Sequence, residues 1–183
     1  MRVSFTAYAD DSIIRGELLL QGDRLSDFIA QDGPFDIAHV TVEALDDGRL
    51  VAADSATISK DDLLAITASG PRGNAARRIR TRPHPTRMKT GPFEVVGYIH
   101  APPSGHPYSG VLRRRVLPAT SVVISYQLAG RPIEVTHDAL LLNPTKIDWL
   151  QAASDEDVRL SKALEIPYKV DAHAKDKTGE LFV

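Results

Sequence analysis

The chain has 183 residues, of which 43% are hydrophobic and 25% are charged, and its formal net charge is −2. This composition is typical of a soluble globular protein, and the absence of cysteine excludes disulfides and thiolate zinc sites. Acidic residues near the N-terminus stand where a signal peptide needs an apolar stretch, and no apolar run approaches the ~18 residues of a membrane-spanning helix. We therefore expect a cytoplasmic protein without a membrane span.

Residues 1–70 have the pattern of a small β-rich unit. Alternating apolar residues predict short strands on either side of polar turns, such as the strong hairpin turn at Asp47-Gly48. One segment instead has apolar residues at helical spacing and ends at Gly33-Pro34, which predicts a short helix. The predicted strands cover residues 3–8, 13–20, 39–45, 50–58 and 63–67, and the predicted helix covers residues 24–31.

Residues 71–92 are predicted to form a basic linker or an outer strand. Gly-Pro, Gly-Asn and Pro-His-Pro elements favour loop geometry in this segment. Residues 76–82 have strand character, but Pro83 and Pro85 would interrupt a strand at once. The segment leads into a second β-rich unit, which we place at residues 93–152.

The two units carry the same order of landmarks. Gly16 in the first unit corresponds to Gly97 in the second, and each glycine lies within an apolar run, where it predicts a bulge or a close backbone approach. The turn at Asp47-Gly48 corresponds to Ala129-Gly130 at a shift of 82 residues, and the segments that follow agree at a shift of 84. A period of this size, present twice, indicates a duplicated domain. The sequence predicts a mainly β protein with short helices, built from two tandem small curled-sheet or SH3/Sm-like barrel domains.

Residues 153–183 are predicted to add a C-terminal helix and a hairpin. Ser154 and Asp157 have the spacing of a capping box, and acidic residues fill the first turn of a helix that runs to about Leu164. In residues 170–183, apolar and polar residues alternate on either side of a polar turn, as they do in the two predicted strands at residues 3–8 and 13–20. Because a lone hairpin is marginal in water, we expect this segment to dock on an exposed sheet edge. Trp149, just before this tail, continues an apolar register and is predicted to lie in the core.

Several motifs resemble those of a small bacterial domain family of unknown function. The second unit contains VVGYIHAPPSG at residues 95–105 and LLLNPTKIDWL at residues 140–150, which are similar to the family's G-Y-I-H-x-P-P and N-x-x-x-I-x-W motifs. The first unit contains its R-L-S-D-F motif at residues 24–28. The chain therefore resembles two divergent tandem copies of this domain. The resemblance implies a domain type and no chemical reaction.

Charge is segregated along the chain. Residues 1–62 hold thirteen acidic and five basic residues, whereas residues 63–133 hold one acidic and eleven basic residues. The basic block either pairs with acidic residues of the same chain or of another subunit, or it binds an external anion. The arginines expected to bind an anion or a partner are Arg77, Arg78, Arg80, Arg82, Arg113, Arg114 and Arg115. Three consecutive arginines cannot all face one way, so at least one of Arg113, Arg114 and Arg115 should be exposed.

No motif for catalysis, cofactor binding or metal binding stands out in the sequence. His100 and His106 flank two prolines, but no His-x-Glu-x-x-His motif, cysteine or neighbouring carboxylate cluster accompanies them. A G-x-S-x-G motif, a Walker A motif and a dinucleotide-binding fingerprint are also absent. We therefore expect no catalytic residue, no cofactor and no metal.

Three functions remain open. We favour a non-enzymatic assembly or adaptor protein that acts through protein–protein association, self-association included, because this explains the duplication and the charge segregation without a catalytic motif. This function predicts a homo-oligomer. The alternative is a protein that binds nucleic acid or another polyanion through the basic segment 72–89 and Arg113 to Arg115, although that region lacks the interleaved aromatic residues of a stacking platform. The third is an enzyme site or ligand pocket between the two units.

Overall fold

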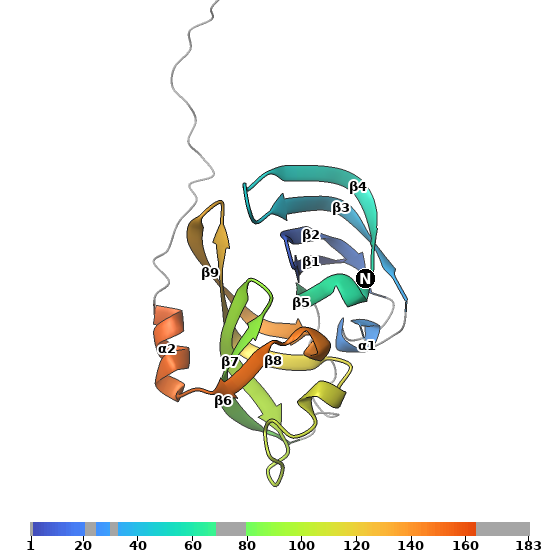
Figure 1. Cartoon of the computed structure of the whole chain (residues 1–183). Coiled ribbons are helices and arrows are strands. Elements are labelled where there is room, and N and C mark those ends of the chain that lie inside the picture. Colours follow the sequence, from blue (N-terminus) through green and yellow to red (C-terminus); the bar gives the residue numbers. More distant parts are fainter. Residues whose placement is uncertain (1, 21–24, 30–32, 69–79, 164–183) are drawn as a thin grey trace, which may run out of the picture.

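A computed structural model describes residues 2–20, 25–29, 33–68 and 80–163 of the chain (Figure 1). The strands are β1 (Arg2–Ala9), β2 (Ser12–Leu19), β3 (Phe35–Ala44), β4 (Leu50–Ile58), β5 (Leu63–Ala68), β6 (Arg82–Thr90), β7 (Phe93–Ala101), β8 (Leu117–Leu128), β9 (Arg131–Leu142) and β10 (Trp149–Ala152). The helices are α1 (Leu25–Ile29) and α2 (Asp155–Ala163), with single 3-10 turns η1 (Lys60–Asp62), η3 (Val111–Arg113) and η4 (Pro144–Lys146). The prediction of a mainly β protein with short helices is confirmed.

All these strands belong to one open antiparallel sheet, in the order β10-β6-β7-β8-β9-β5-β1-β2-β3-β4. The two halves of the sheet meet where β5 pairs with β9, with Ala65 opposite Leu142 and Ile66 opposite Leu141. The described strands therefore do not form the closed SH3-like or Sm-like barrels that we considered. Closure of a barrel requires the edges of one unit to pair with each other, whereas β5 pairs with the other half and β4 and β10 stay at the outside.

Each half of the sheet has the same strand order. The first half reads β5-β1-β2-β3-β4, and the second reads β10-β6-β7-β8-β9. The ladders are irregular at Gly16 in β2 and at Gly97 in β7, as the sequence predicted. Across from these glycines, His39 in β3 and Ser121 in β8 both have φ of 51°, a conformation that the sequence did not predict. A Cβ atom at Gly16 would lie 2.8 Å from the carbonyl oxygen of Ala38, so the close approach of these strands requires glycine.

Strand β6 corrects the expectation that prolines would end a strand in this segment. It pairs with β7 along its whole length, including Pro83 and Pro85. On its other side, β10 pairs with β6 only from Thr86 to Lys89. Pro83 and Pro85 therefore lie in a part of β6 that is paired with a neighbouring strand on one side only, where a missing N–H is tolerated. Residues 71–79 of the predicted linker lie outside the described residues.

The larger of two hydrophobic clusters joins both halves of the sheet. It contains Tyr8 and Leu64 from the first half together with Phe93 and Leu140 from the second, and all four are almost fully buried. The ring of Tyr8 meets that of Phe93 edge to face, with 5.2 Å between their centroids. The smaller cluster lies within the first half. Because each half is small, the shared cluster lets each one bury apolar surface that it would otherwise expose.

The predicted capping box is confirmed at the start of α2. Ser154 Oγ accepts a hydrogen bond from the Asp157 N–H at 3.0 Å, and the Ser154 N–H donates to Asp157 Oδ2 at 2.7 Å. The helix packs against β7 and β8 and buries Val158. Among the described helices, none is long and apolar enough to cross a membrane. The predicted C-terminal hairpin, residues 170–183, lies outside the described residues.

The prediction that Trp149 lies in the core is wrong. Its side chain is 42% exposed. Trp149 begins β10, the outermost strand of the second half, which has a paired neighbour on one side only. An apolar register in the sequence therefore reports which side chains share a face, but not whether a further strand covers them.

Candidate functional site

The predicted anion-binding arginines separate into two places. Arg77 and Arg78 lie outside the described residues. Arg82 is the first residue of β6 and Arg80 lies two residues before it, and both are exposed. Arg113, Arg114 and Arg115 lie at the end of η3 and just after it. In this triplet Arg113 and Arg115 are exposed and Arg114 is half-buried, so the expectation that at least one is exposed is confirmed.

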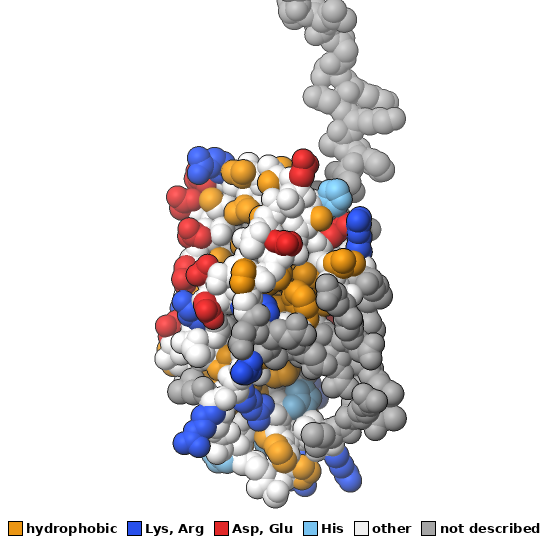
Figure 2. Space-filling model, turned by 90° about the vertical axis from the view of Figure 1, so that its right-hand side faces the viewer, with side chains coloured by type: hydrophobic (Ala, Val, Ile, Leu, Met, Phe, Trp, Pro, Cys, Tyr) orange, Lys and Arg blue, Asp and Glu red, His pale blue; other side chains and the backbone are white. Residues whose placement is uncertain are grey.

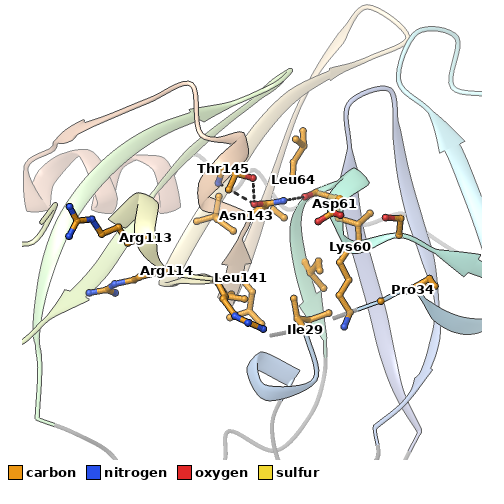
Figure 3. A pocket seen from close by; sticks show the side chains of 18 residues that line it. Ile29, Pro34, Lys60, Asp61, Leu64, Arg113, Arg114, Leu141, Asn143 and Thr145 are labelled. Atoms are coloured by element: carbon orange, nitrogen blue, oxygen red, sulfur yellow. Dashed lines mark hydrogen bonds between the residues drawn. The ribbon is translucent and has the colours of Figure 1, made fainter. Parts of the chain in front are cut away.

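The triplet Arg113 to Arg115 lies at a pocket of about 600 Å³ at the junction between the two halves (Figure 3). The pocket is surrounded by the end of α1, the turn η1, strand β5, the segment after η3 and the end of β9. The lining residues are Ile29, Gly33, Pro34, Ser59, Lys60, Asp61, Leu63, Leu64, Ala65, Ile66, Arg113, Arg114, Arg115, Val116, Leu141, Leu142, Asn143 and Thr145. The sequence suggested a pocket between the two units but gave no signal for its residues, because they come from segments far apart in the chain.

The wall of the pocket is mixed: aliphatic side chains stand beside polar and charged ones, which cover slightly more of its exposed surface. Leu63 and Leu64 are almost fully buried and belong to the central strand β5. Ile29, Val116 and Leu141 are half-buried, and part of each side chain is available to a bound molecule. None of the lining residues is aromatic. The pocket therefore offers dispersion and hydrophobic contact, but no ring on which a nucleobase could stack.

Asn143 holds the two halves together at the pocket and has little hydrogen-bonding capacity left for a ligand. Its side-chain amide donates from Nδ2 to the carbonyl oxygen of Leu63 at 3.2 Å. Its Oδ1 accepts from the N–H of Thr145 at 3.1 Å and from the Thr145 hydroxyl at 2.8 Å. The contact with Leu63 connects the end of β9 to the start of β5. Recognition of a polar ligand therefore falls mainly on the charged side chains of the rim.

The charged side chains lie on opposite sides of the pocket. On the η1 side, Lys60 donates from Nζ to the carbonyl oxygen of Phe28 at 3.1 Å, and Asp61 next to it is exposed. On the η3 side, Arg113 and Arg114 form no ion pair or hydrogen bond with another described side chain. Figure 3 shows the side chains of Arg113 and Arg114 pointing away from Lys60 and from the centre of the pocket. Their positive charge therefore faces the outside of the pocket.

The charge segregation of the sequence persists on the surface. Figure 2 shows acidic side chains on the upper part of one face, around the first half, and most basic side chains on the lower part. Arg2 pairs with Glu17 and Arg15 pairs with Glu43, all within the first half. Within the second half, Arg87 pairs with Glu94 at 3.2 Å. The ion pairs seen among the described residues thus stay within one half and do not join the acidic first half to the basic block.

Two half-buried histidines, His100 and His137, have structural partners. The Tyr8 hydroxyl lies 2.6 Å from Nε2 of His137, and Nε2 of His100 lies 2.8 Å from the Thr120 hydroxyl. Burial lowers the pKa of both histidines below the usual 6.5. Within the described part of the chain, no group of three or more His, Asp or Glu side chains is arranged to hold a metal ion. These histidines therefore serve as hydrogen-bonding groups within the sheet.

A second exposed feature is the outer edge of β4. Six successive residues from Leu50 to Ser55 are exposed, with Leu50 at 60% and Val51 at 54%. Asp54 is the one charged residue of this strand. The sequence predicted the strand at 50–58, but its position at the edge follows from the pairing of β5 with β9, for which the sequence has no local signal.

Comparisons of the chain with protein families, with curated proteins and with solved structures found no match. The resemblance to a bacterial domain family therefore rests on the short motifs alone.

Proposed function

We propose that this chain is a non-enzymatic assembly protein, built from two copies of one β domain, that associates with further copies of itself through β4. The observation that carries the proposal is the exposed edge of β4, with Leu50 and Val51 more than half exposed. Natural proteins usually protect such an edge with charges, prolines or bulges, because its unpaired main-chain groups attract another strand. From Leu50 to Ala53 this edge has none of these devices.

The duplication is supported by the matching halves of the sheet. Both have the same strand order, a glycine at the irregular point of β2 or β7, and a residue with φ of 51° across from it. In the β8–β9 hairpin, pairing continues to Leu128 opposite Arg131, whereas in the β3–β4 hairpin it ends at Glu43 opposite Leu50. The second hairpin is therefore longer. This extra length accounts for the change in spacing between matching residues of the two units, from 82 residues before the turn to 84 after it.

The direction of the main-chain groups predicts how two β4 strands would pair. The Ala44 N–H donates to the carbonyl oxygen of Arg49 at 3.0 Å, which makes these residues a hydrogen-bonded pair. Hydrogen-bonded and non-hydrogen-bonded pairs alternate along an antiparallel ladder, so the main-chain groups of Leu50 and Ala52 point away from β3. Two such edges related by a two-fold axis would pair Leu50 with Ala52 of the second copy, and place the two Val51 residues opposite each other. This register keeps the two Asp54 carboxylates apart.

Light scattering after size exclusion tests the proposal over a range of protein concentrations. The wild-type chain is expected to form a dimer, and V51K to weaken it by at least about tenfold, because a lysine would be buried opposite its own copy. The matched control is L19K, since Leu19 is 56% exposed but lies on the interior strand β2. A monomeric wild type, or equal effects of the two variants, would overturn self-association through β4.

Cysteine crosslinking tests the register itself, on a background without native cysteine. In the proposed dimer, V51C should form an intermolecular disulfide under mild oxidation, because facing residues of a non-hydrogen-bonded pair lie within disulfide distance. Gln127 is exposed on β8 and provides the control Q127C, which should stay monomeric on a denaturing gel. Equal crosslinking of both variants would count against the register.

Polyanion binding is a second candidate, favoured by Arg80 and Arg82. Both are exposed, and neither forms an ion pair with a described carboxylate. If these arginines contact phosphates, binding of a single-stranded DNA oligonucleotide should weaken steeply with salt, and R80Q/R82Q should reduce the salt dependence. Binding that is absent at low salt, or unchanged in this variant, would remove this candidate.

A further inference from the structure

The outer edge of β10 is a second free edge, at the opposite end of the sheet from β4. Within the described part of the chain, β10 pairs with β6 and with no other strand. Trp149, Gln151 and Ala152 on this strand are exposed. Of the usual protections of an edge, which are charges, prolines, bulges and shortness, β10 has only the last. The edge is therefore open to a further strand.

The duplication identifies the counterpart of β10 in the first half, which is β5. Each of the two strands follows a 3-10 turn, and each pairs with the first strand of its half, β6 or β1. At the shift of 84 residues, Trp149 corresponds to Ala65 and Leu150 corresponds to Ile66. What covers the outer edge of β5 therefore indicates what the edge of β10 accepts.

The end of β9 covers the outer edge of β5. Leu142 lies opposite Ala65, and Leu141 lies opposite Ile66. This ladder is itself short, so a strand as short as β10 offers enough main chain for the same contact. The counterpart on β10 is an extended strand with apolar residues opposite the first two residues of β10.

Lys89 of β6 restricts the charge of such a strand. It lies opposite Trp149, as Tyr8 of β1 lies opposite Ala65. The Tyr8 hydroxyl reaches across the junction to His137 of β9 at 2.6 Å. Lys89 forms no ion pair with a carboxylate among the described residues. A carboxylate at the position of His137 in the added strand would therefore meet an ammonium group of opposite charge.

We propose that the β10 edge binds an extended segment of a partner protein, which adds one strand in the register that β9 has on β5. The segment has apolar residues opposite Trp149 and Leu150, and a carboxylate that faces Lys89. Main-chain hydrogen bonds supply affinity and these side chains supply specificity. The proposal does not rest on self-association, because β4 lies at the other end of the sheet, and V51K should bind the segment as the wild type does.

Trp149 is the single tryptophan of the chain and is 42% exposed, so it reports on this edge. The probe is a synthetic peptide with the sequence of residues 136–144 in which glutamate replaces His137. Titration into the full chain should shift the indole fluorescence to shorter wavelength in a saturable way. The peptide that keeps the histidine should bind about threefold more weakly, as loss of one ion pair requires, and K89Q should remove this difference.

Proline in the peptide tests the register on the wild-type chain. The Asn143 N–H donates to the carbonyl oxygen of Leu64 at 2.9 Å, so by alternation the main-chain groups of Leu141 also point towards β5. Leu141→Pro in the peptide removes an N–H that would bond to β10, and should weaken binding by about fivefold or more. Leu140→Pro is the matched control, because the Leu140 N–H points away from that edge, and it should cost much less.

Proline in the protein locates the edge. The Ala153 N–H donates to the carbonyl oxygen of Pro85 at 3.0 Å, so the N–H of Ala152 points away from β6 and A152P spares the pairing within the chain. A152P should weaken peptide binding by about fivefold or more, whereas A52P at the β4 edge should leave it unchanged. Far-UV circular dichroism checks that both variants fold, and the peptide comparison decides if A152P does not.

The proposal is overturned by the absence of a saturable shift with the glutamate peptide, by equal binding of the two proline peptides, or by equal effects of A152P and A52P. A shift of the Trp149 fluorescence with rising concentration of the chain alone, without peptide binding, would also overturn it and would assign the edge to a second copy.

Discussion

The hydrogen bond between Tyr8 and His137 connects the two halves of the sheet, and its removal should measure how strongly they stabilise each other. Tyr8 belongs to β1 and His137 to β9, and 2.6 Å separates the Tyr8 hydroxyl from Nε2. Burial raises the pKa of Tyr8 well above the usual 10.0, and burial lowers the pKa of His137. The hydroxyl therefore keeps its proton and the imidazole is neutral, so the two groups share one hydrogen bond without a charge.

Tyr8→Phe removes this hydroxyl and preserves the ring that packs against Phe93 and Tyr126. The free energy of unfolding therefore falls by the contribution of this hydrogen bond and by the cost of leaving Nε2 of His137 without its partner. For a buried group this amounts to about 1–3 kcal/mol, and because His137 is only half-buried, we expect about 1–2 kcal/mol. The shape of the shared hydrophobic cluster should not change.

Urea unfolding followed by far-UV circular dichroism measures this loss. Tyr126→Phe is the control, because Tyr126 lies in the same aromatic cluster and its hydroxyl forms no hydrogen bond with a described residue. We expect the control to change the free energy of unfolding by less than about 0.5 kcal/mol. In the double variant with His137→Leu, Tyr8→Phe should cost less than it does alone, since the partner is already gone. If Tyr8→Phe costs no more than the control, the hydrogen bond does not stabilise the junction.

Because burial lowers the pKa of His137 and His100 below 6.5, the unfolded chain binds more protons than the folded one just below that pH. Stability should therefore fall as the pH drops below about 6.5, and His137→Leu should reduce this slope in urea titrations. Gly16→Ala should lower the free energy of unfolding by about 1–3 kcal/mol, since the new Cβ would lie 2.8 Å from a main-chain oxygen. Gly105→Ala is the control: it lies in an exposed loop, the nearest atom to its Cβ would be 3.3 Å away, and the loss in the same urea assay should be much smaller. Ser154→Ala removes the cap of α2 and should lower the melting temperature by about 2–4 °C in a calorimetric scan, whereas no change would mean that the capping box is unimportant.

The local features of this protein could be predicted from the sequence because they depend on neighbours in the chain. The turns at Asp47-Gly48 and Ala129-Gly130 have positive φ at Gly48, Ala129 and Gly130, and a glycine after a short polar or small residue favours this geometry in any context. The capping box of Ser154 and Asp157 likewise spans one helical turn. Alternation of apolar residues identified most strands for the same reason, since the side-chain period of a strand is a property of its own backbone.

Tertiary structure alone decided which strands are neighbours, and this determined the candidate sites. Pairing of β5 with β9 leaves the sheet open, places β4 and Trp149 at its edges, and creates the pocket between Lys60 and Arg113. Pro83 and Pro85 could enter β6 only because β10 stops short of them. Each of these outcomes depends on contacts between residues far apart in the chain, where the free energy of packing and of main-chain pairing selects among arrangements that are locally equivalent.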